Sequence, residues 1–231
     1  MLRKMIVELI GTFFLVLTIG QVVIEPGAGA LAPLAIGSAL MVMVFAGGHI
    51  SGAHYNPAVT LAVFLRRRAT LPEVGAYWAA QIVGAVLAVF VVKWLKGDAI
   101  ITPMVLATGP ALVAEFLFTF ALGYVVLNVA TASGNKGNSH YGLSIGFIVL
   151  AGAFAVGGIS GGAFNPAVAV GITMLGLVEA SSFWIYLVAN LAGGAAAALV
   201  FNALEMDDDK AVASKPADQA SLRSPADTKG R

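Results

Sequence analysis

Five long stretches of this 231-residue chain contain no Asp, Glu, Lys or Arg, and they constrain what it can fold into. Two of these stretches, 26–65 and 137–178, are too long for one membrane helix, which needs about 20 apolar residues. A further apolar stretch, Met5–Ile24, is interrupted only by Glu8. The pattern is that of an integral membrane protein. The stretches with the length of one span each are 74–92, 116–135 and 180–204.

The two longest charge-free stretches have similar interiors. Gly47–Gly52 lies in the first and Gly157–Gly162 in the second, and both segments are rich in Gly and Ser. Such segments favour a break in a helix. We therefore expect each stretch to hold one full span, a non-helical segment and a half-helix that enters the membrane and returns. The predicted fold is an all-α membrane protein with six transmembrane helices and two re-entrant half-helices.

The composition excludes several classes of protein. Charged residues make up 11% of the chain, whereas a soluble domain carries roughly 25%. The net charge is +1 and no basic stripe is present, so we expect no nucleic-acid partner and take the lipid bilayer as the surroundings. Cysteine is absent, and neither a metal-ligand cluster, a nucleotide-binding motif nor a catalytic dyad is recognisable. We expect no metal, no cofactor and no enzymatic activity.

Basic residues are distributed unevenly along the chain. With the N-terminus inside, only Lys93 and Lys96 fall on the outer side, which predicts that both termini are cytoplasmic. Residues 206–231 are charged, rich in Ala, Ser and Pro, and predict a disordered cytoplasmic tail. Because the chain is short and lacks long extensions, we expect a bacterial protein of the cytoplasmic (inner) membrane.

The two halves of the chain repeat one another. Asn56-Pro57-Ala58 recurs as Asn165-Pro166-Ala167, at an offset of 109 residues. One repeat, about 1–100, and the other, about 108–205, each hold three spans and one half-helix, and together they form the membrane domain 1–205. Three is an odd number, so the second repeat must be inverted, and inverted repeats meet near the mid-plane. Other equivalent residues are Gln81 and Asn190, Gly84 and Gly193, and Glu8 and Glu115.

The repeated Asn-Pro-Ala motif has the form of a helix start. Asn is a strong N-cap, and Pro is well tolerated at the first helical position. Each half-helix would therefore direct its N-terminus, worth about half a positive charge, at the membrane centre. Asn56 and Asn165 would there offer amide donors. Two converging positive helix ends repel cations while the amides bind neutral molecules, which predicts a pore for neutral solutes.

Residues 1–205 resemble the aquaporin (major intrinsic protein) family. The resemblance rests on the paired Asn-Pro-Ala motifs, on the segment Gly48–Thr60, and on the intramembrane residues Glu8 and Glu115. It implies six tilted helices around one pore in each subunit, with the subunits assembled as a homotetramer.

The residue after the second motif departs from that family. Most members have arginine there, at the narrowest point of the pore, whereas this chain has Val168. The other three constriction positions, carried over by spacing from the motifs, are Ile36, Ala153 and Gly162. A wider, apolar selectivity filter predicts a passive channel for water, glycerol and similar polyols, and undissociated metalloid acids such as arsenous acid. The alternative is a water-selective aquaporin with an unusual filter.

Glu8 and Glu115 are ionisable residues within membrane spans, and such residues are functional by default. One interpretation is that the two carboxylates form a proton relay or belong to an ion-coupled secondary transporter. Solute uptake by such a transporter would saturate and depend on protons or sodium. The other is structural, because a helix broken in the membrane leaves backbone groups that need partners. We expect the structural role, with the two carboxylates holding the backbone before Asn56 and Asn165.

Overall fold

The structure is a computed structural model that describes residues 1–204 and Met206. Over these residues the secondary-structure elements are helices, joined by non-helical segments. Apart from Met206, the predicted tail at 206–231 lies outside the described residues. Six of the described helices are long and apolar enough to cross a membrane. The elements are α1 Leu2–Val23, η1 Gly29–Leu31, α2 Ala32–Ser51, α3 Pro57–Leu65, α4 Leu71–Lys96, α5 Thr108–Val126, η2 Leu127–Thr131, η3 Ser133–Asn135, α6 Tyr141–Ser160, α7 Pro166–Met174, η4 Ala180–Ser182 and α8 Phe183–Ala203.

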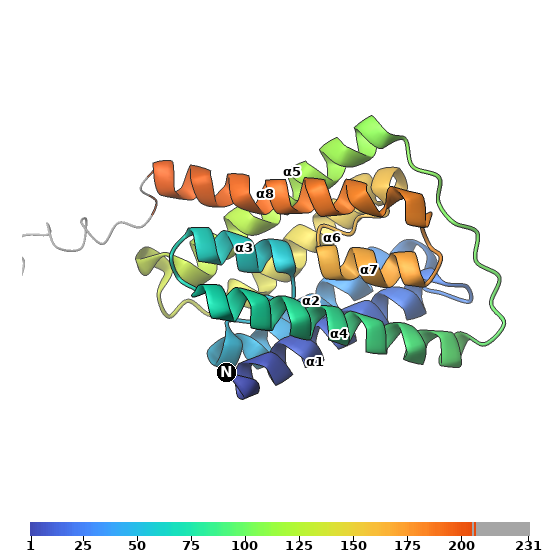
Figure 1. Cartoon of the computed structure of the whole chain (residues 1–231), viewed down its shortest axis with the longest axis horizontal. Helices are drawn as coiled ribbons and strands as arrows, with labels where there is room; N and C mark the ends of the chain where they lie inside the picture. Colours follow the sequence, from blue (N-terminus) through green and yellow to red (C-terminus); the bar gives the residue numbers. More distant parts are fainter. Residues whose placement is uncertain (205, 207–231) are drawn as a thin grey trace, which may run out of the picture.

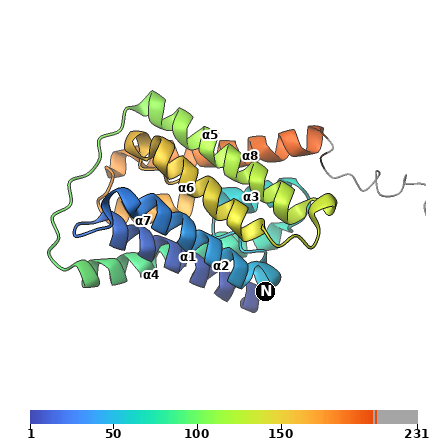
Figure 2. The same ribbon diagram turned by 180° about the vertical axis from the view of Figure 1, so that it is seen from behind.

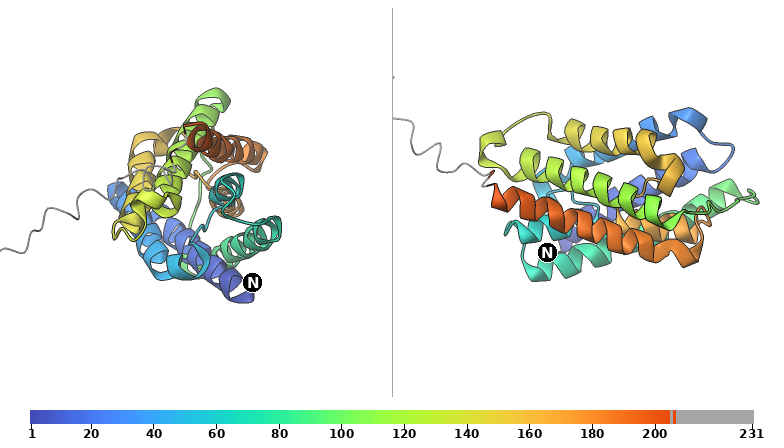
Figure 3. Two further views of the ribbon diagram at one scale, coloured as in Figure 1. Left: turned by 90° about the vertical axis from the view of Figure 1, so that its left-hand side faces the viewer. Right: turned by 90° about the horizontal axis from the view of Figure 1, so that it is seen from above.

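The short helices α3 and α7 lie end to end across the middle of the bundle (Figure 1). They are flanked by α4 on one side and α8 on the other, as the end-on view of Figure 3 also shows for α3. The helices α1, α2, α5 and α6 cover the other side, seen from behind in Figure 2. Because α3 and α7 approach from opposite ends, their N-termini meet at the centre. The predicted pair of inverted repeats, each with three spans and a half-helix, is the observed fold.

The helix breaks lie within the two predicted Gly- and Ser-rich segments, toward their C-terminal ends. Helix α2 continues through Gly47 and ends at Ser51, and α6 ends at the equivalent Ser160. The chain turns at the next residues, Gly52 and Gly161, whose φ angles are 89° and 84°. A left-handed residue ends a helix because it redirects the backbone, whereas a glycine with helical angles only weakens it.

Glycines bring the equivalent helix pairs α1–α4 and α5–α8 into close contact. A Cβ atom on Gly84 would lie 2.5 Å from the carbonyl oxygen of Leu9, and one on Gly193 would lie 2.6 Å from that of Phe116. Both distances are well below a normal van der Waals contact. Small residues therefore allow these helices to pack backbone against backbone, as is common in membranes.

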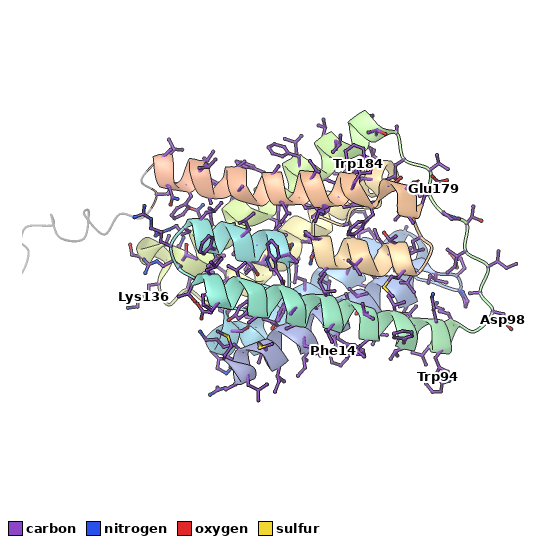
Figure 4. The ribbon with its side chains drawn as sticks, in the orientation of Figure 1. Phe14, Trp94, Asp98, Lys136, Glu179 and Trp184 are labelled. Carbon is purple, nitrogen blue, oxygen red and sulfur yellow. The ribbon has the colours of Figure 1, made fainter. Side chains whose placement is uncertain are left out.

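The outer surface of the bundle is apolar between two charged ends. Figure 4 shows Phe14, Trp94 and Trp184 pointing away from the helices; Trp94 is largely exposed, and the other two are about half-exposed. Lys136 lies at one end, while Asp98 and Glu179 lie at the other. This distribution suits a chain whose middle is surrounded by lipid tails and whose ends reach water.

Candidate functional site

Asn56 caps the first half-helix, as the motif predicts. Its Oδ1 accepts hydrogen bonds from the backbone N–H groups of Ala58, at 2.8 Å, and Val59, at 3.4 Å. Its Nδ2 donates to the backbone carbonyl oxygen of Phe164, at 2.9 Å. Phe164 immediately precedes Asn165 in the second motif, so the cap of one half-helix is bonded to the loop of the other.

Asn165 makes the reciprocal set of contacts. Its Oδ1 accepts from the N–H groups of Ala167, at 2.9 Å, and Val168, at 3.4 Å, and its Nδ2 donates to the carbonyl oxygen of Tyr55, at 2.8 Å. Each amide nitrogen carries two hydrogens, and one of them is used between the repeats. The sequence predicted free donors and did not anticipate this reciprocal bonding.

Glu8 is fully buried beside the first helix break and accepts four hydrogen bonds. Oε1 accepts from the Ser51 hydroxyl at 2.7 Å and the His54 N–H at 2.9 Å. Oε2 accepts from the Tyr55 N–H at 2.6 Å and from Gln81 Nε2 at 2.8 Å. These donors include backbone groups of the non-helical segment, which cannot bond within a helix.

Glu115 has the same surroundings at the second break. Oε1 accepts from the Ser160 hydroxyl at 2.7 Å and the Ala163 N–H at 2.9 Å, and Oε2 accepts from the Phe164 N–H at 2.7 Å. With the Asn190 amide turned so that its nitrogen faces the carboxylate, Nδ2 donates to Oε2 at 2.9 Å. The two carboxylates do not meet, because each lies beside the break of its own repeat.

The four predicted filter residues line one cavity of about 460 Å³, which also reaches Glu25. Three of the four, Ile36, Gly162 and Val168, also line a narrower cavity of about 30 Å³, next to Asn56 and Asn165. The narrower space has room for about two water molecules. Among the described residues lining the two cavities, Glu25 is the one Asp, Glu, Lys or Arg, and it is exposed.

His54 lines the narrow cavity and is oriented by Thr60. The Thr60 hydroxyl donates to the carbonyl oxygen of Asn56 at 3.0 Å, and its oxygen lies 3.1 Å from His54 Nδ1. Because the hydroxyl hydrogen is already used, Nδ1 is assigned as the donor to Thr60, which leaves Nε2 as an acceptor. The equivalent position in the second repeat is Ala163, so this polar group belongs to one repeat alone.

Two tyrosines of the site were missed by the sequence analysis. The Tyr77 hydroxyl donates to the carbonyl oxygen of Ser51 at 2.7 Å, and the Tyr186 hydroxyl donates to that of Ser160 at 2.5 Å. Tyr77 and Tyr186 are separated by the same 109 residues as the two motifs. Comparing the halves position by position would therefore have found them.

The comparisons with known proteins agree with this arrangement. The family model described as major intrinsic protein matches residues 1–201. The chain belongs to the major intrinsic protein family. Aquaporin NIP1-1 of Oryza sativa subsp. japonica is 41% identical, over 87% of this chain and 74% of that protein, and aquaporin NIP1-1 of Zea mays is 38% identical over the same shares. The solved aquaglyceroporin of Plasmodium falciparum has a TM-score of 0.73 and 24% identity, covering 87% of this chain and 95% of that one, and supports the fold.

Membership of the major intrinsic protein family makes this chain a membrane channel for water and small solutes, and members of the family are channels rather than enzymes. The predicted bacterial inner membrane is wrong, because the relatives are aquaporins of rice, maize and Arabidopsis thaliana, which are plants. The comparisons and the six apolar helices support a multi-pass membrane protein and not that location. Most of the chain consists of membrane spans, and the thickness of the bilayer sets the length of each span. The length of the chain therefore carries no information about its source.

Proposed function

We propose that this channel conducts water together with neutral solutes of the size of glycerol, including polyols and undissociated metalloid acids, through an apolar constriction. One observation carries the proposal. Ile36, Ala153, Gly162 and Val168 line the same cavity, and their side chains include no charge and no hydrogen-bonding group. Such a ring selects by width, whereas a ring with an arginine also requires defined hydrogen bonds.

Cation exclusion is assigned to the centre of the pore. The N-termini of α3 and α7 converge there, and each contributes the positive end of a helix dipole. The second amide hydrogens of Asn56 and Asn165 would bind a lone pair of a neutral solute. The narrow cavity at this point has no carboxylate among its described lining residues, so a cation there meets two positive helix ends directly, which supports a pore for neutral molecules.

Glu8 and Glu115 are assigned a structural role. Each carboxylate accepts four hydrogen bonds from groups around its own helix break, and each is fully buried. An ion-coupled transporter needs carboxylates that exchange protons or ions during its cycle. Groups committed to four fixed donors are poorly suited to that task, which favours passive conduction.

The channel unit is proposed to span residues 1–205 and to assemble as a homotetramer. Among the six spans, those formed by Gly29–Ser51 and Tyr141–Ser160 are the least buried within one subunit. Their exposed apolar faces include Leu34, Val42 and Phe147, and they offer surface to neighbouring copies. Chemical cross-linking in native-like lipid, with bands up to four subunits expected and dimers alone as the contradicting result, tests the assembly.

Stopped-flow light scattering on proteoliposomes tests the filter. Water permeability is read from shrinkage in an impermeant osmolyte, and solute permeability from re-swelling in glycerol. In the wild type we expect rapid re-swelling. Val168→Arg should reduce glycerol permeability by about tenfold or more while water permeability changes less than about threefold. Val168→Met, which adds an unbranched apolar chain without charge or hydrogen-bond donors, should have an intermediate effect and separates bulk from charge and hydrogen bonding.

The outcomes separate the alternatives. Fast water flux without glycerol entry in the wild type would overturn the broad-substrate proposal and leave a water-selective channel. Saturable uptake that depends on a proton or sodium gradient would instead support a coupled transporter. Linear, gradient-driven flux of both water and glycerol is the result that the apolar constriction predicts.

A further inference from the structure

Helices α4 and α8 each present a tyrosine and an amide side chain one helical turn apart. On α4 these are Tyr77 and Gln81, and on α8 they are Tyr186 and Asn190. Residues four apart share a helix face, so both side chains of a pair reach the same break. The amide bonds to the buried carboxylate, while the tyrosine holds the last carbonyl group of the broken helix.

The chain that follows the held carbonyl differs between the repeats. After Ser160 come Gly161 and Gly162, with φ angles of 84° and 64°, whereas after Ser51 come Gly52 and Ala53. Two successive glycines have no Cβ atoms to restrict their backbone. Their conformation therefore depends more on hydrogen bonds to neighbouring groups than that of the first repeat does.

The two segments also occupy different parts of the pore. Gly162 lines both cavities, while Ala53 lines only the narrow one. The Ser160 hydroxyl accepts from the N–H group of Gly162 at 3.2 Å. A Cβ atom on Gly162 would lie 3.5 Å from the Cα of Ala153, so the two filter backbones face each other closely. A small shift of Gly162 changes the width of the filter.

We propose that Tyr186 is a positioning residue that sets the size limit of the filter. It acts through Ser160 on Gly162 and touches no solute itself, since its side chain is fully buried. The inference rests on the proposed function, in which Gly162 forms part of the filter. Tyr77 makes the equivalent bond where no filter residue follows, so its hydroxyl affects conduction without affecting the size limit.

The test compares Tyr186→Phe with Tyr77→Phe in proteoliposomes. Both substitutions keep the ring and remove one hydroxyl. In Tyr186→Phe the backbone of the glycine pair is no longer held, so it can shift and the filter can widen for larger solutes. The ratio of erythritol to glycerol permeability should therefore rise by at least about threefold. In Tyr77→Phe the ratio should stay at the wild-type value, even where both permeabilities fall together. No change in Tyr186→Phe, or an equal change in both variants, overturns the inference.

A second matched pair covers the case in which a tyrosine variant does not fold. Ser160→Ala removes the acceptor for the N–H group of Gly162, and Ser51→Ala removes the equivalent acceptor, which lies 3.0 Å from the N–H group of Ala53. Ser160→Ala should raise the ratio, and Ser51→Ala should not. Equal ratios in the two serine variants would overturn the inference as firmly as equal ratios in the tyrosine pair.

A failure of the proposed function can be distinguished from a failure of the role assigned to Tyr186. If wild-type vesicles pass no glycerol, the broad-substrate proposal fails, and the comparison is then made with formamide and water. A raised ratio of formamide to water permeability in Tyr186→Phe, absent from Tyr77→Phe, would still support the role of Tyr186. An unchanged ratio would overturn it independently of which solutes the wild type accepts.

Discussion

Replacing either buried glutamate by glutamine should destabilise the protein to a similar extent. In Glu115→Gln the side chain keeps its shape, but one carboxylate oxygen becomes an amide that can only donate. Oε2 now accepts from the Phe164 N–H at 2.7 Å and from Asn190 Nδ2 at 2.9 Å. With the amide nitrogen in place of Oε2, these two donors would face a third donor. Asn190 cannot rotate without loss, because its Oδ1 accepts from the N–H group of Asn165 at 2.9 Å.

The first repeat has no better way to compensate. Oε1 of Gln81 is buried and has no hydrogen-bond partner among the described residues. In Glu8→Gln the Gln81 amide could accept from the new side chain only by rotating, which would break the hydrogen bond that its Nε2 donates to the Thr60 hydroxyl oxygen at 3.1 Å and leave Nε2 where Oε1 now has no partner. A buried donor without a partner costs about 1–3 kcal/mol. Two such donors cost about 2–6 kcal/mol in either variant.

The loss can be measured as a shift in melting temperature. For a chain of this size 1 kcal/mol corresponds to roughly 2–4 °C, so each variant should melt about 4–24 °C below the wild type. Both variants and the wild type would be purified in the same detergent and melted at one scan rate, because membrane proteins often unfold irreversibly. The reasoning is refuted if either variant melts at the temperature of the wild type.

Two further substitutions test the packing and the pore centre. Gly84→Ala places a Cβ atom 2.5 Å from the Leu9 carbonyl oxygen and should destabilise the protein by at least about 1–3 kcal/mol. Gly75→Ala, in the same helix with nothing within 4 Å, should stabilise it by up to about 1 kcal/mol; similar melting temperatures for the two would contradict the clash. Asn165→Asp puts a carboxylate oxygen where Nδ2 donates to the Tyr55 carbonyl oxygen, and it offsets the positive helix end. We expect a faster proton or cation leak, read with an internal pH dye, and an unchanged leak would contradict the assigned exclusion.

The placement of the helices could be predicted because the bilayer fixes their length and expels charge from their middle. The two overlong stretches split as expected into a span and a half-helix. The position of the break was less predictable. Gly47 remains helical, and its missing side chain leaves the space that the hydroxyl end of Tyr55 occupies. This is a tertiary contact that no local pattern records.

The candidate site was partly predictable for a similar reason. The constriction positions that the family resemblance implies, carried over by spacing from the motifs, are Ile36, Ala153, Gly162 and Val168. The structure brings these four residues to one cavity, and their role in selection stays a prediction. Because the rise and rotation per residue of a helix are fixed, a residue a few turns from a motif can be placed by counting from it. The hydrogen bonds between the loops depend on how the halves meet, which the sequence of either half does not specify.

The reciprocal bonding of the two asparagines also concerns how the protein forms. The amide of Asn56 donates to Phe164, 108 residues later, and the amide of Asn165 donates to Tyr55, 110 residues earlier. Neither repeat contains the acceptor that its own asparagine needs. Before the second repeat has been made, the Nδ2 group of Asn56 therefore lacks the acceptor that it has in the folded channel. The centre of the pore can form only when both halves of the chain are present.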